Sequence, residues 1–290
     1  MTATLRIAEP KSVAQVVELL QTDPGARCLA GGATLVAMMN AGLADDVSLL
    51  VSLRSVDELR GIERRADGSV RIGAMTRHVE TAGSMLLIEG QQVVCEAAKV
   101  VANHVVRNMG TIGGSVAFAD PAADYLPALL VADAVIDVAG PAGRRRVPIA
   151  EYGLDWYTTA LMPGEIVVSI ELPPAPANSI GLYKKFGRTY GDFAIASIAV
   201  ILCAAQGRVA TIRCAVGACG PAPVRLPQAE ELLQGTALES TVVAKAGRLL
   251  ADACDPLDDV RASSAFRRTL VPRLLGSALA EAWQRLEHGR

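Results

Sequence analysis

Asn108-Met-Gly-Thr-Ile-Gly-Gly-Ser-Val-Ala-Phe-Ala-Asp-Pro-Ala-Ala-Asp124 is the stretch around which this chain is organised. Its glycines are Gly110, Gly113 and Gly114. Because glycine has no Cβ atom, the backbone here can turn left-handed or approach other groups closely, and can present successive N–H groups to one concavity. Thr111 and Ser115 add hydroxyl donors, and the apolar run behind them can begin a helix. The pattern predicts an anion-binding site.

Asp124 ends the stretch. Its carboxylate can accept hydrogen bonds from a ribose or an adenine amine, so the whole stretch suits a nucleotide diphosphate. For an isolated Gly-Gly pair, the alternative is a tight turn that serves only to reverse the chain.

A second glycine cluster, Cys28-Leu-Ala-Gly-Gly-Ala-Thr-Leu35, makes the nucleotide interpretation more specific. A short apolar run enters its Gly-Gly turn, and another apolar run follows. Two loops of the same chemical kind can converge on one pyrophosphate from two sides, which a single turn cannot do.

Composition excludes several classes of protein. The formal net charge is −2, and no basic amphipathic stretch occurs, so nucleic-acid and anionic-membrane binding are not expected. No apolar run reaches the roughly 20 residues that span a bilayer, and no signal-peptide pattern opens the chain. Hydrophobic residues make up 51%, which suggests that some apolar surface is buried against partners. We expect a cytoplasmic protein.

The cysteines and histidines do not form a metal-ligand pattern. The cysteines are scattered among apolar neighbours, with no Cys-x-x-Cys pair and no spacing typical of zinc or an iron–sulfur cluster. We therefore expect no metal in this chain, and buried, reduced thiols. No residue stands out as a general base or a nucleophile, so no catalytic side chain is predicted.

The N-terminal region alternates between strand and helix patterns. Strands are predicted at 4–8, 27–30 and 47–53, with helices after Ser12 and over 35–41. This β-α-β-α-β order places a loop at the carboxyl end of a strand, where ligands collect. No Gly-x-Gly-x-x-Gly follows a strand and no P-loop occurs, so NAD binding of the Rossmann type is disfavoured.

Pro173-Pro-Ala-Pro-Ala-Asn178 is the clearest domain boundary, because neither a helix nor a central strand tolerates such a run. Before it, Ala66-Asp-Gly68 predicts a hairpin and 91–102 a helix. Beyond it, strands are predicted at 181–188, 193–205 and 208–217, and helices at 228–234, 240–253 and 263–287. The fold class is α+β.

Four motifs resemble the FAD-binding medium subunit of molybdenum hydroxylases, the family of the aerobic carbon monoxide dehydrogenase flavoprotein and the xanthine dehydrogenase flavin domain. They are Ala30–Leu35, Arg107–Ser115, Ala119–Asp124 and Phe186–Ala194. The resemblance covers essentially the whole chain. It implies an FAD-binding fold of the PCMH/VAO type, with subdomains at 1–55 and 56–174, followed by a C-terminal β-β-β-α-α-α domain at 178–290.

The resemblance also implies which residues bind FAD. The two glycine loops cradle the pyrophosphate, an acidic residue contacts the adenosine part, an aliphatic residue packs on the flavin, and a lysine lies near its ring. These roles fall on Cys28, Leu29, Ala30, Gly31, Gly32, Ala33, Thr34 and Leu35, on Thr111, Ile112, Gly113, Gly114 and Ser115, and on Asp124, Val167 and Lys184. Lys185, next to Lys184, leaves the register of the lysine open.

Two positions depart from the family pattern. Ala33 replaces a residue that is polar in many relatives, and Val101 falls where xanthine dehydrogenase-like members carry an aromatic over the isoalloxazine. We therefore expect the flavin face to be held differently here.

In function, the resemblance implies an oxidoreductase subunit that relays electrons. A molybdopterin-containing large subunit would hydroxylate the substrate, and a 2Fe-2S small subunit, also a separate chain, would carry electrons to FAD. FAD would then reduce NAD⁺, oxygen or another acceptor, with the protein supplying position and electrostatics. The alternatives are a self-sufficient FAD-dependent oxidoreductase of the same superfamily and a scaffold subunit that has lost FAD.

Overall fold

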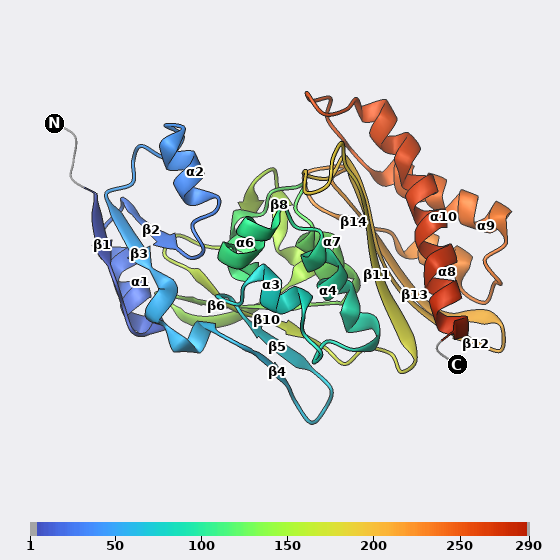
Figure 1. Ribbon diagram of the computed structural model, residues 1–290, viewed down its shortest axis with the longest axis horizontal. Helices are drawn as coiled ribbons and strands as arrows, with labels where there is room; N and C mark the ends of the chain where they lie inside the picture. The colour runs from blue at the N-terminus through green and yellow to red at the C-terminus, as the bar shows by residue number, and fades with distance from the viewer. Residues whose placement is uncertain (1–4, 289–290) are drawn as a thin grey trace.

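The computed structural model describes residues 5–288, which form three units in a row. Figure 1 shows a small N-terminal unit, a middle unit built on a larger sheet, and a C-terminal unit in which helices cover one face of a sheet.

The N-terminal unit is a parallel three-stranded sheet of order β1-β3-β2. Its α1 begins after Ser12, whose side chain accepts a hydrogen bond from the Gln15 N–H, as the capping pattern predicted. The predicted strand at 4–8 is β1, although Thr4 itself lies outside the described residues. The elements are β1 (Arg6–Ala8), α1 (Val13–Thr22), β2 (Ala26–Leu29), α2 (Leu35–Asn40) and β3 (Leu49–Ser52).

The middle unit is an antiparallel sheet of order β4-β5-β10-β6-β7, whose central strand β10 is buried along its whole length. The predicted hairpin is confirmed, since β4 pairs with β5 and Gly68 in the turn has a φ of +85°. The strands are β4 (Ile62–Arg64), β5 (Val70–Gly73), β6 (Val135–Gly140), β7 (Gly143–Pro148) and β10 (Ile166–Leu172), with a small hairpin of β8 (Gly153–Asp155) and β9 (Thr158–Thr159).

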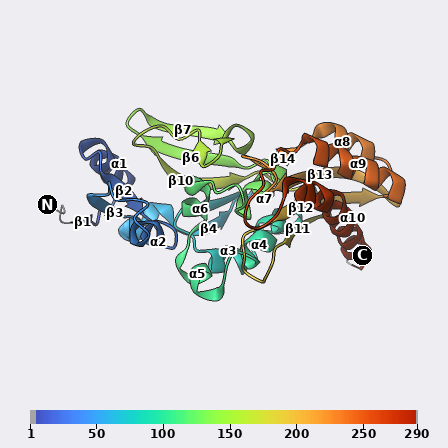
Figure 2. The same ribbon diagram turned by 90° about the horizontal axis from the view of Figure 1, so that it is seen from above.

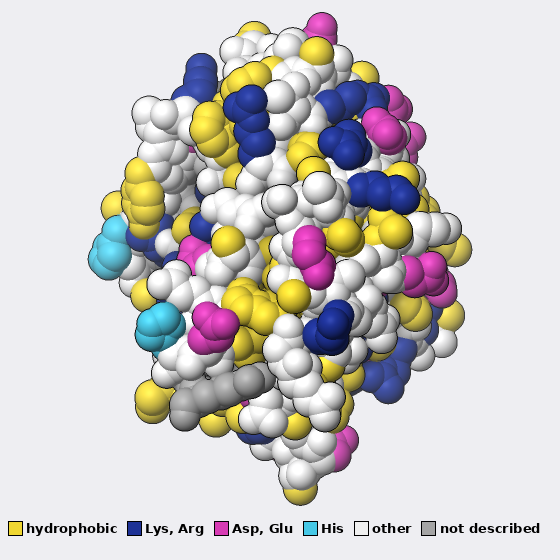
Figure 3. Space-filling view, turned by 90° about the vertical axis from the view of Figure 1, so that its right-hand side faces the viewer, with side chains coloured by type: hydrophobic (Ala, Val, Ile, Leu, Met, Phe, Trp, Pro, Cys, Tyr) yellow, Lys and Arg dark blue, Asp and Glu magenta, His cyan; other side chains and the backbone are white. Residues whose placement is uncertain are grey.

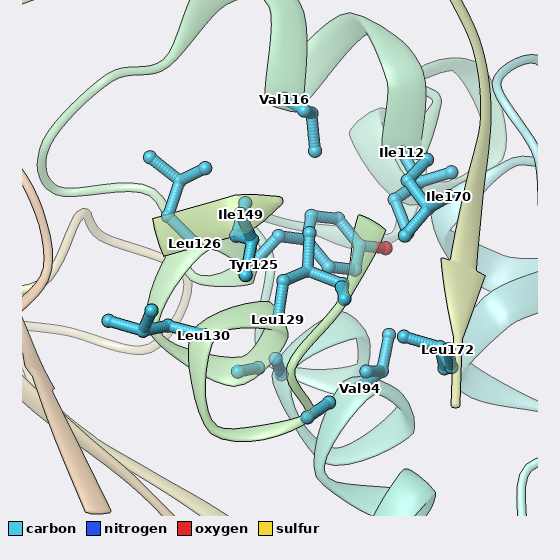
Figure 4. Close-up of a cluster of buried hydrophobic side chains, with 14 of the residues drawn as sticks. Val94, Ile112, Val116, Tyr125, Leu126, Leu129, Leu130, Ile149, Ile170 and Leu172 are labelled. Atoms are coloured by element: carbon cyan, nitrogen blue, oxygen red, sulfur yellow. The ribbon is translucent and has the colours of Figure 1, made fainter. Parts of the chain in front are cut away.

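Short helices lie on one side of this sheet (Figure 2). They are α3 (His78–Ala82), α4 (Gln92–Lys99), α5 (His104–Met109), α6 (Ile112–Phe118) and α7 (Tyr125–Val131). Apolar side chains of α4, α6 and α7 meet those of β10 in one core, in which Val94, Ile112, Val116, Tyr125 and Ile170 lie together (Figure 4). The predicted helix at 91–102 ends earlier, at Lys99, and α5 follows it as an additional helix.

The C-terminal unit is an antiparallel sheet of order β11-β12-β13-β14 covered by helices. The three predicted strands are present, and a two-residue strand, β14, extends the sheet. The elements are β11 (Ser179–Phe186), β12 (Ala196–Ala205), β13 (Arg208–Gly217), β14 (Val224–Arg225), α8 (Pro227–Leu233), α9 (Ser240–Ala253) and α10 (Ser264–His288). Seen from this end, the molecule shows side chains of both charge signs around hydrophobic ones (Figure 3).

The C-terminal sheet belongs to two hydrophobic cores at once. Tyr183, Ala199 and Ile201 pack into the core of the middle unit, while Leu182 and Val200 pack beneath the helices of the C-terminal unit. This follows from the alternation of side chains along a strand, with both faces buried. The proline stretch 173–178 contains no helix or strand.

The exact domain limits 1–55, 56–174 and 178–290 stay a prediction, because the last two units share a core, and residues 1–4 and 289–290 lie outside the described range.

Arg267 ties α10 to the C-terminal sheet. Its side chain is buried and donates hydrogen bonds to the carbonyl oxygens of Ile195 and Ala218, and it forms an ion pair with Asp259. Arg267→Ala leaves these acceptors without their donor, so we expect the free energy of unfolding to fall by about 2–3 kcal/mol in urea titration.

The neighbouring Arg268 provides the matched control for Arg267. Its side chain is 39% exposed and lies 3.9 Å from Asp255. Arg268→Ala should change the free energy of unfolding by less than about 1 kcal/mol. Equal losses in the two variants would contradict the role given to Arg267.

Candidate functional site

A cavity of about 600 Å³ lies between the N-terminal unit and the helices of the middle unit. Both glycine segments line it, the first between β2 and α2 and the second at the start of α6. The segment 191–193, between β11 and β12, also contributes to its wall. Ligand and cofactor sites have volumes of roughly 300–1,000 Å³, so this cavity is large enough for one.

The first glycine segment offers free backbone donors to the cavity. Among the hydrogen bonds of residues 5–288, none uses the backbone N–H groups of residues 31–34. Gly32 has a φ of +76°, a left-handed conformation that glycine adopts at little cost. A short run of unpaired N–H groups that includes a left-handed residue is suited to an anion such as a phosphate.

The second glycine segment uses its donors within the protein. The N–H of Ile112 donates to the Thr76 carbonyl at 3.0 Å, and that of Gly113 to the Ala74 carbonyl at 2.9 Å. The N–H of Gly114 donates to the Thr111 hydroxyl at 3.1 Å, which makes Thr111 the N-cap of α6. The expectation that this segment presents a series of N–H groups to a ligand is therefore not met at residues 112–114. Residues 112–114 therefore support the wall of the cavity and do not offer their N–H groups to a ligand.

The glycines are needed because two backbones come close together. A Cβ atom built on Gly31 would lie 2.0 Å from the carbonyl oxygen of Met109 and 2.7 Å from the Cα of Gly110. A Cβ atom on Gly113 would lie 2.4 Å from the Cβ of Ala74. Such distances are far inside van der Waals contact. Glycine at 31 therefore allows the two segments to meet, and glycine at 113 allows α6 to approach the end of β5.

Asp124 lies in the wall with its carboxylate held by the protein. The Tyr183 hydroxyl donates to it at 2.8 Å, and the ammonium of Lys185 lies 3.1 Å away. Burial raises the pKa of Asp124 to about 6, and Lys185 and Tyr183 oppose this rise. Lys185 also donates to the carbonyl of Val100 at 2.7 Å, so a buried cation is fixed directly behind the cavity wall.

Lys184 lies on the opposite face of β11. Its ammonium donates to the hydroxyl of Ser277 and forms an ion pair with Glu281, both at 2.8 Å and both on α10. The structure thus does not bring Lys184 to the cavity, because adjacent residues of a strand point to opposite faces of the sheet. Lys185, whose side chain is only 9% exposed, is the lysine that approaches the site.

Most of the predicted site residues meet in this cavity. Those that line it are Cys28, Ala30, Gly31, Gly32, Ala33, Thr34, Leu35, Thr111, Gly113, Gly114, Ser115, Asp124 and Val167. Leu29, Ile112 and Lys184 do not line it. Val101, at the position of the missing aromatic, is in the wall.

Sequence reasoning missed His78, Asp120 and Phe193 as parts of the wall. Asp120 and Phe193 fall inside the motifs Ala119–Asp124 and Phe186–Ala194, so these motifs were the signal that could have placed them in the wall. His78 gave no signal, because it belongs to no recognised motif.

Two family models cover nearly the whole chain. Residues 3–175 match the "FAD binding domain in molybdopterin dehydrogenase", and residues 181–282 match the "CO dehydrogenase flavoprotein C-terminal domain". The chain belongs to this family. Its cofactor is FAD, and the resemblance seen in the glycine motifs is confirmed.

The relatives of this family member are subunits of oxidoreductases. The carbon monoxide dehydrogenase medium chain of Hydrogenophaga pseudoflava is 34% identical, over 95% of this chain and 96% of that protein. The 6-hydroxypseudooxynicotine dehydrogenase complex subunit alpha of Paenarthrobacter nicotinovorans is also 34% identical, over 93% of each.

Solved structures give the same result for the fold. A chain of the Cu,Mo-CO dehydrogenase superposes with a TM-score of 0.93 at 32% identity, covering 98% of this chain and 99% of that one. A chain of quinoline 2-oxidoreductase from Pseudomonas putida 86 gives 0.92 at 29% identity, covering 99% of both. In the described part of the chain, no helix is long and apolar enough to cross a membrane.

The close approach of Gly31 can be tested by adding one methyl group. Gly31→Ala forces the two glycine segments apart, so we expect FAD to bind at least about tenfold more weakly, as overpacking of about 1–3 kcal/mol implies. Fluorescence titration of the stripped chain with FAD measures this. Gly83→Ala is the control, since its Cβ atom would meet nothing nearer than 3.5 Å. Undiminished FAD affinity of Gly31→Ala would contradict the placement of the site.

The two neighbouring lysines make a second matched pair. Lys185→Met leaves the buried carboxylate of Asp124 without its cation, so at pH 8 the free energy of unfolding should fall by about 3–5 kcal/mol. Lys184→Met breaks a partly exposed pair with Glu281, and the loss should stay below about 1 kcal/mol. Urea unfolding of both variants gives the comparison, and similar losses would refute the assignment of Lys185.

Proposed function

We propose that this chain is the FAD-carrying electron-transfer subunit of a multi-subunit molybdenum hydroxylase. The observation that carries the proposal is the run of free N–H groups at residues 31–34 in the wall of the cavity. FAD is the family's cofactor, and its pyrophosphate is the anion that these donors suit.

The lining of the cavity suits a dinucleotide in its chemistry. It includes the free donors of residues 31–34 and the apolar side chains of Val101 and Val167. The lining residues contain one cation, Arg27, which is paired with Asp46. The phosphate charges are therefore balanced mainly by backbone dipoles.

Bound FAD would supply the redox chemistry, by taking up two electrons and releasing them to an acceptor. The chain binds and orients the cofactor and keeps water from its apolar side. Lys185 and Asp124 form a buried ion pair whose charges largely cancel, so the pair fixes the position of Asp124 in the cavity wall.

The partners in this proposal are a molybdopterin-containing large subunit and a 2Fe-2S small subunit, each a separate chain. Support comes from the relatives, which are named as medium chains or as subunits of complexes. It also comes from exposed apolar side chains beside the cavity, since Val105 is 65% exposed and Tyr190 is 76% exposed. Electrons would enter from the 2Fe-2S subunit and leave to NAD⁺, oxygen or another acceptor.

The test has two readouts. The purified chain should show a flavin absorbance spectrum, and denaturation should release FAD at about one molecule per chain, identified by chromatography. Expressed with its native operon neighbours, it should also co-purify with chains that contain molybdenum and iron. A chain that remains colourless after incubation with FAD contradicts cofactor binding, and a flavin-loaded chain that oxidises an organic substrate alone contradicts the relay.

A further inference from the structure

His78 lies in the wall of the cavity with one ring nitrogen bound and the other free. The residue is only 4% exposed, and its Nδ1 atom lies 3.0 Å from the Tyr125 hydroxyl in the core. Within residues 5–288 no hydrogen bond uses Nε2. Nε2 is also not sealed inside the protein, because the enclosed polar atoms without a partner are Ser197 Oγ and Arg267 Nε in the described residues. Since the two nitrogens lie on different edges of the ring and Nδ1 faces the core, Nε2 is a free polar atom that keeps contact with the cavity.

The Nδ1 atom is already engaged with the Tyr125 hydroxyl, so Nε2 is the ring nitrogen left for a ligand. In the neutral ring Nε2 carries either a proton or a lone pair, and a hydroxyl group, which both donates and accepts, can bond to it in either case. Burial and the charge of Arg107 lower the pKa of His78 to about 4, so the ring is neutral near pH 7.

The position of Nε2 relates it to the phosphate-binding segment. A Cβ atom on Gly110 would lie 2.6 Å from Nε2, and the Cα of Gly110 is also the atom that Gly31 approaches. Nε2 therefore lies beside the segment that Gly31 contacts, in the lining of the cavity that also contains the free N–H groups of residues 31–34. A hydroxyl group can bond to Nε2 in either tautomer, whereas a phosphate, which only accepts, can bond only to a protonated Nε2. In FAD the hydroxyl groups next to the phosphates are those of the ribityl chain and of the ribose.

We propose that Nε2 of His78 forms a hydrogen bond with a hydroxyl group of FAD adjacent to its pyrophosphate. This inference rests on the proposed function, in which the pyrophosphate binds at residues 31–34. Tyr125 acts as a positioning residue, since its hydroxyl engages Nδ1 and leaves the outer nitrogen to the ligand.

Two substitutions of His78 distinguish the roles of its two ring nitrogens. His78→Asn puts an amide near the place of Nδ1, so it keeps a partner for Tyr125 and removes the outer polar atom. His78→Gln puts an amide near the place of Nε2 and restores a hydrogen-bonding group there. On the stripped full-length chain, fluorescence titration should show FAD binding weakened about tenfold in His78→Asn and by less than about threefold in His78→Gln.

Fragments of the cofactor identify the hydroxyl. FMN carries the ribityl chain and ADP carries the ribose, so loss of affinity in His78→Asn for FMN alone or for ADP alone supports the proposal and names the source. Equal loss for both fragments together with a lower melting temperature would show a purely structural role and overturn it.

FAD binding by the wild-type chain distinguishes the role of His78 from the proposed function. Wild type that binds FAD, with a His78→Asn variant that binds it equally tightly, overturns the role of His78 alone. Wild type that binds no FAD contradicts the proposed function, and the inference falls with it.

Discussion

The contact of Gly31 with the backbone at Met109 and Gly110 is the constraint on which the site depends. It joins a parallel sheet unit to a layer of short helices through main-chain atoms, without side chains between them. The N–H groups of the second segment are hydrogen-bonded to Thr76, to Ala74 and to the N-cap Thr111, so this segment is rigid. The first segment lies against it, and its own N–H groups at residues 31–34 are free for a ligand. One segment provides the support and the other the binding groups.

The cationic side chains at the cavity are also paired within the protein. Among the described residues, the one cation in the lining of the cavity, Arg27, is paired with Asp46, and Lys185, behind the wall, is paired with Asp124. A buried ion pair of this kind contributes little to stability as a whole, but removing one member is costly. The pair therefore fixes the position of a charge more than it strengthens the fold.

The sequence predicted most of the residues that share the lining of the cavity, but not the hydrogen bonds that they form. Glycine motifs and the proline boundary are local signals, and they predicted the wall of the cavity and the order of units. The partners of the second segment are carbonyl groups far away in the chain, such as that of Ala74, so local sequence could not show that its donors are used. Nor could alternation choose between Lys184 and Lys185, since both faces of β11 are covered. Short elements such as α5 and β14 carry too few residues for a periodic pattern.

The site depends on residues of the C-terminal sheet, although the two family models divide the chain before that sheet. The model for the FAD-binding domain ends at residue 175, yet Tyr183 and Lys185 come from beyond it. A chain cut at that boundary would keep both glycine segments and lose the groups that hold Asp124, while the apolar surface beneath Ala199 and Ile201 would face water. The first module is therefore chemically incomplete on its own, because a carboxylate in the wall of its cavity takes both of its partners from the second module.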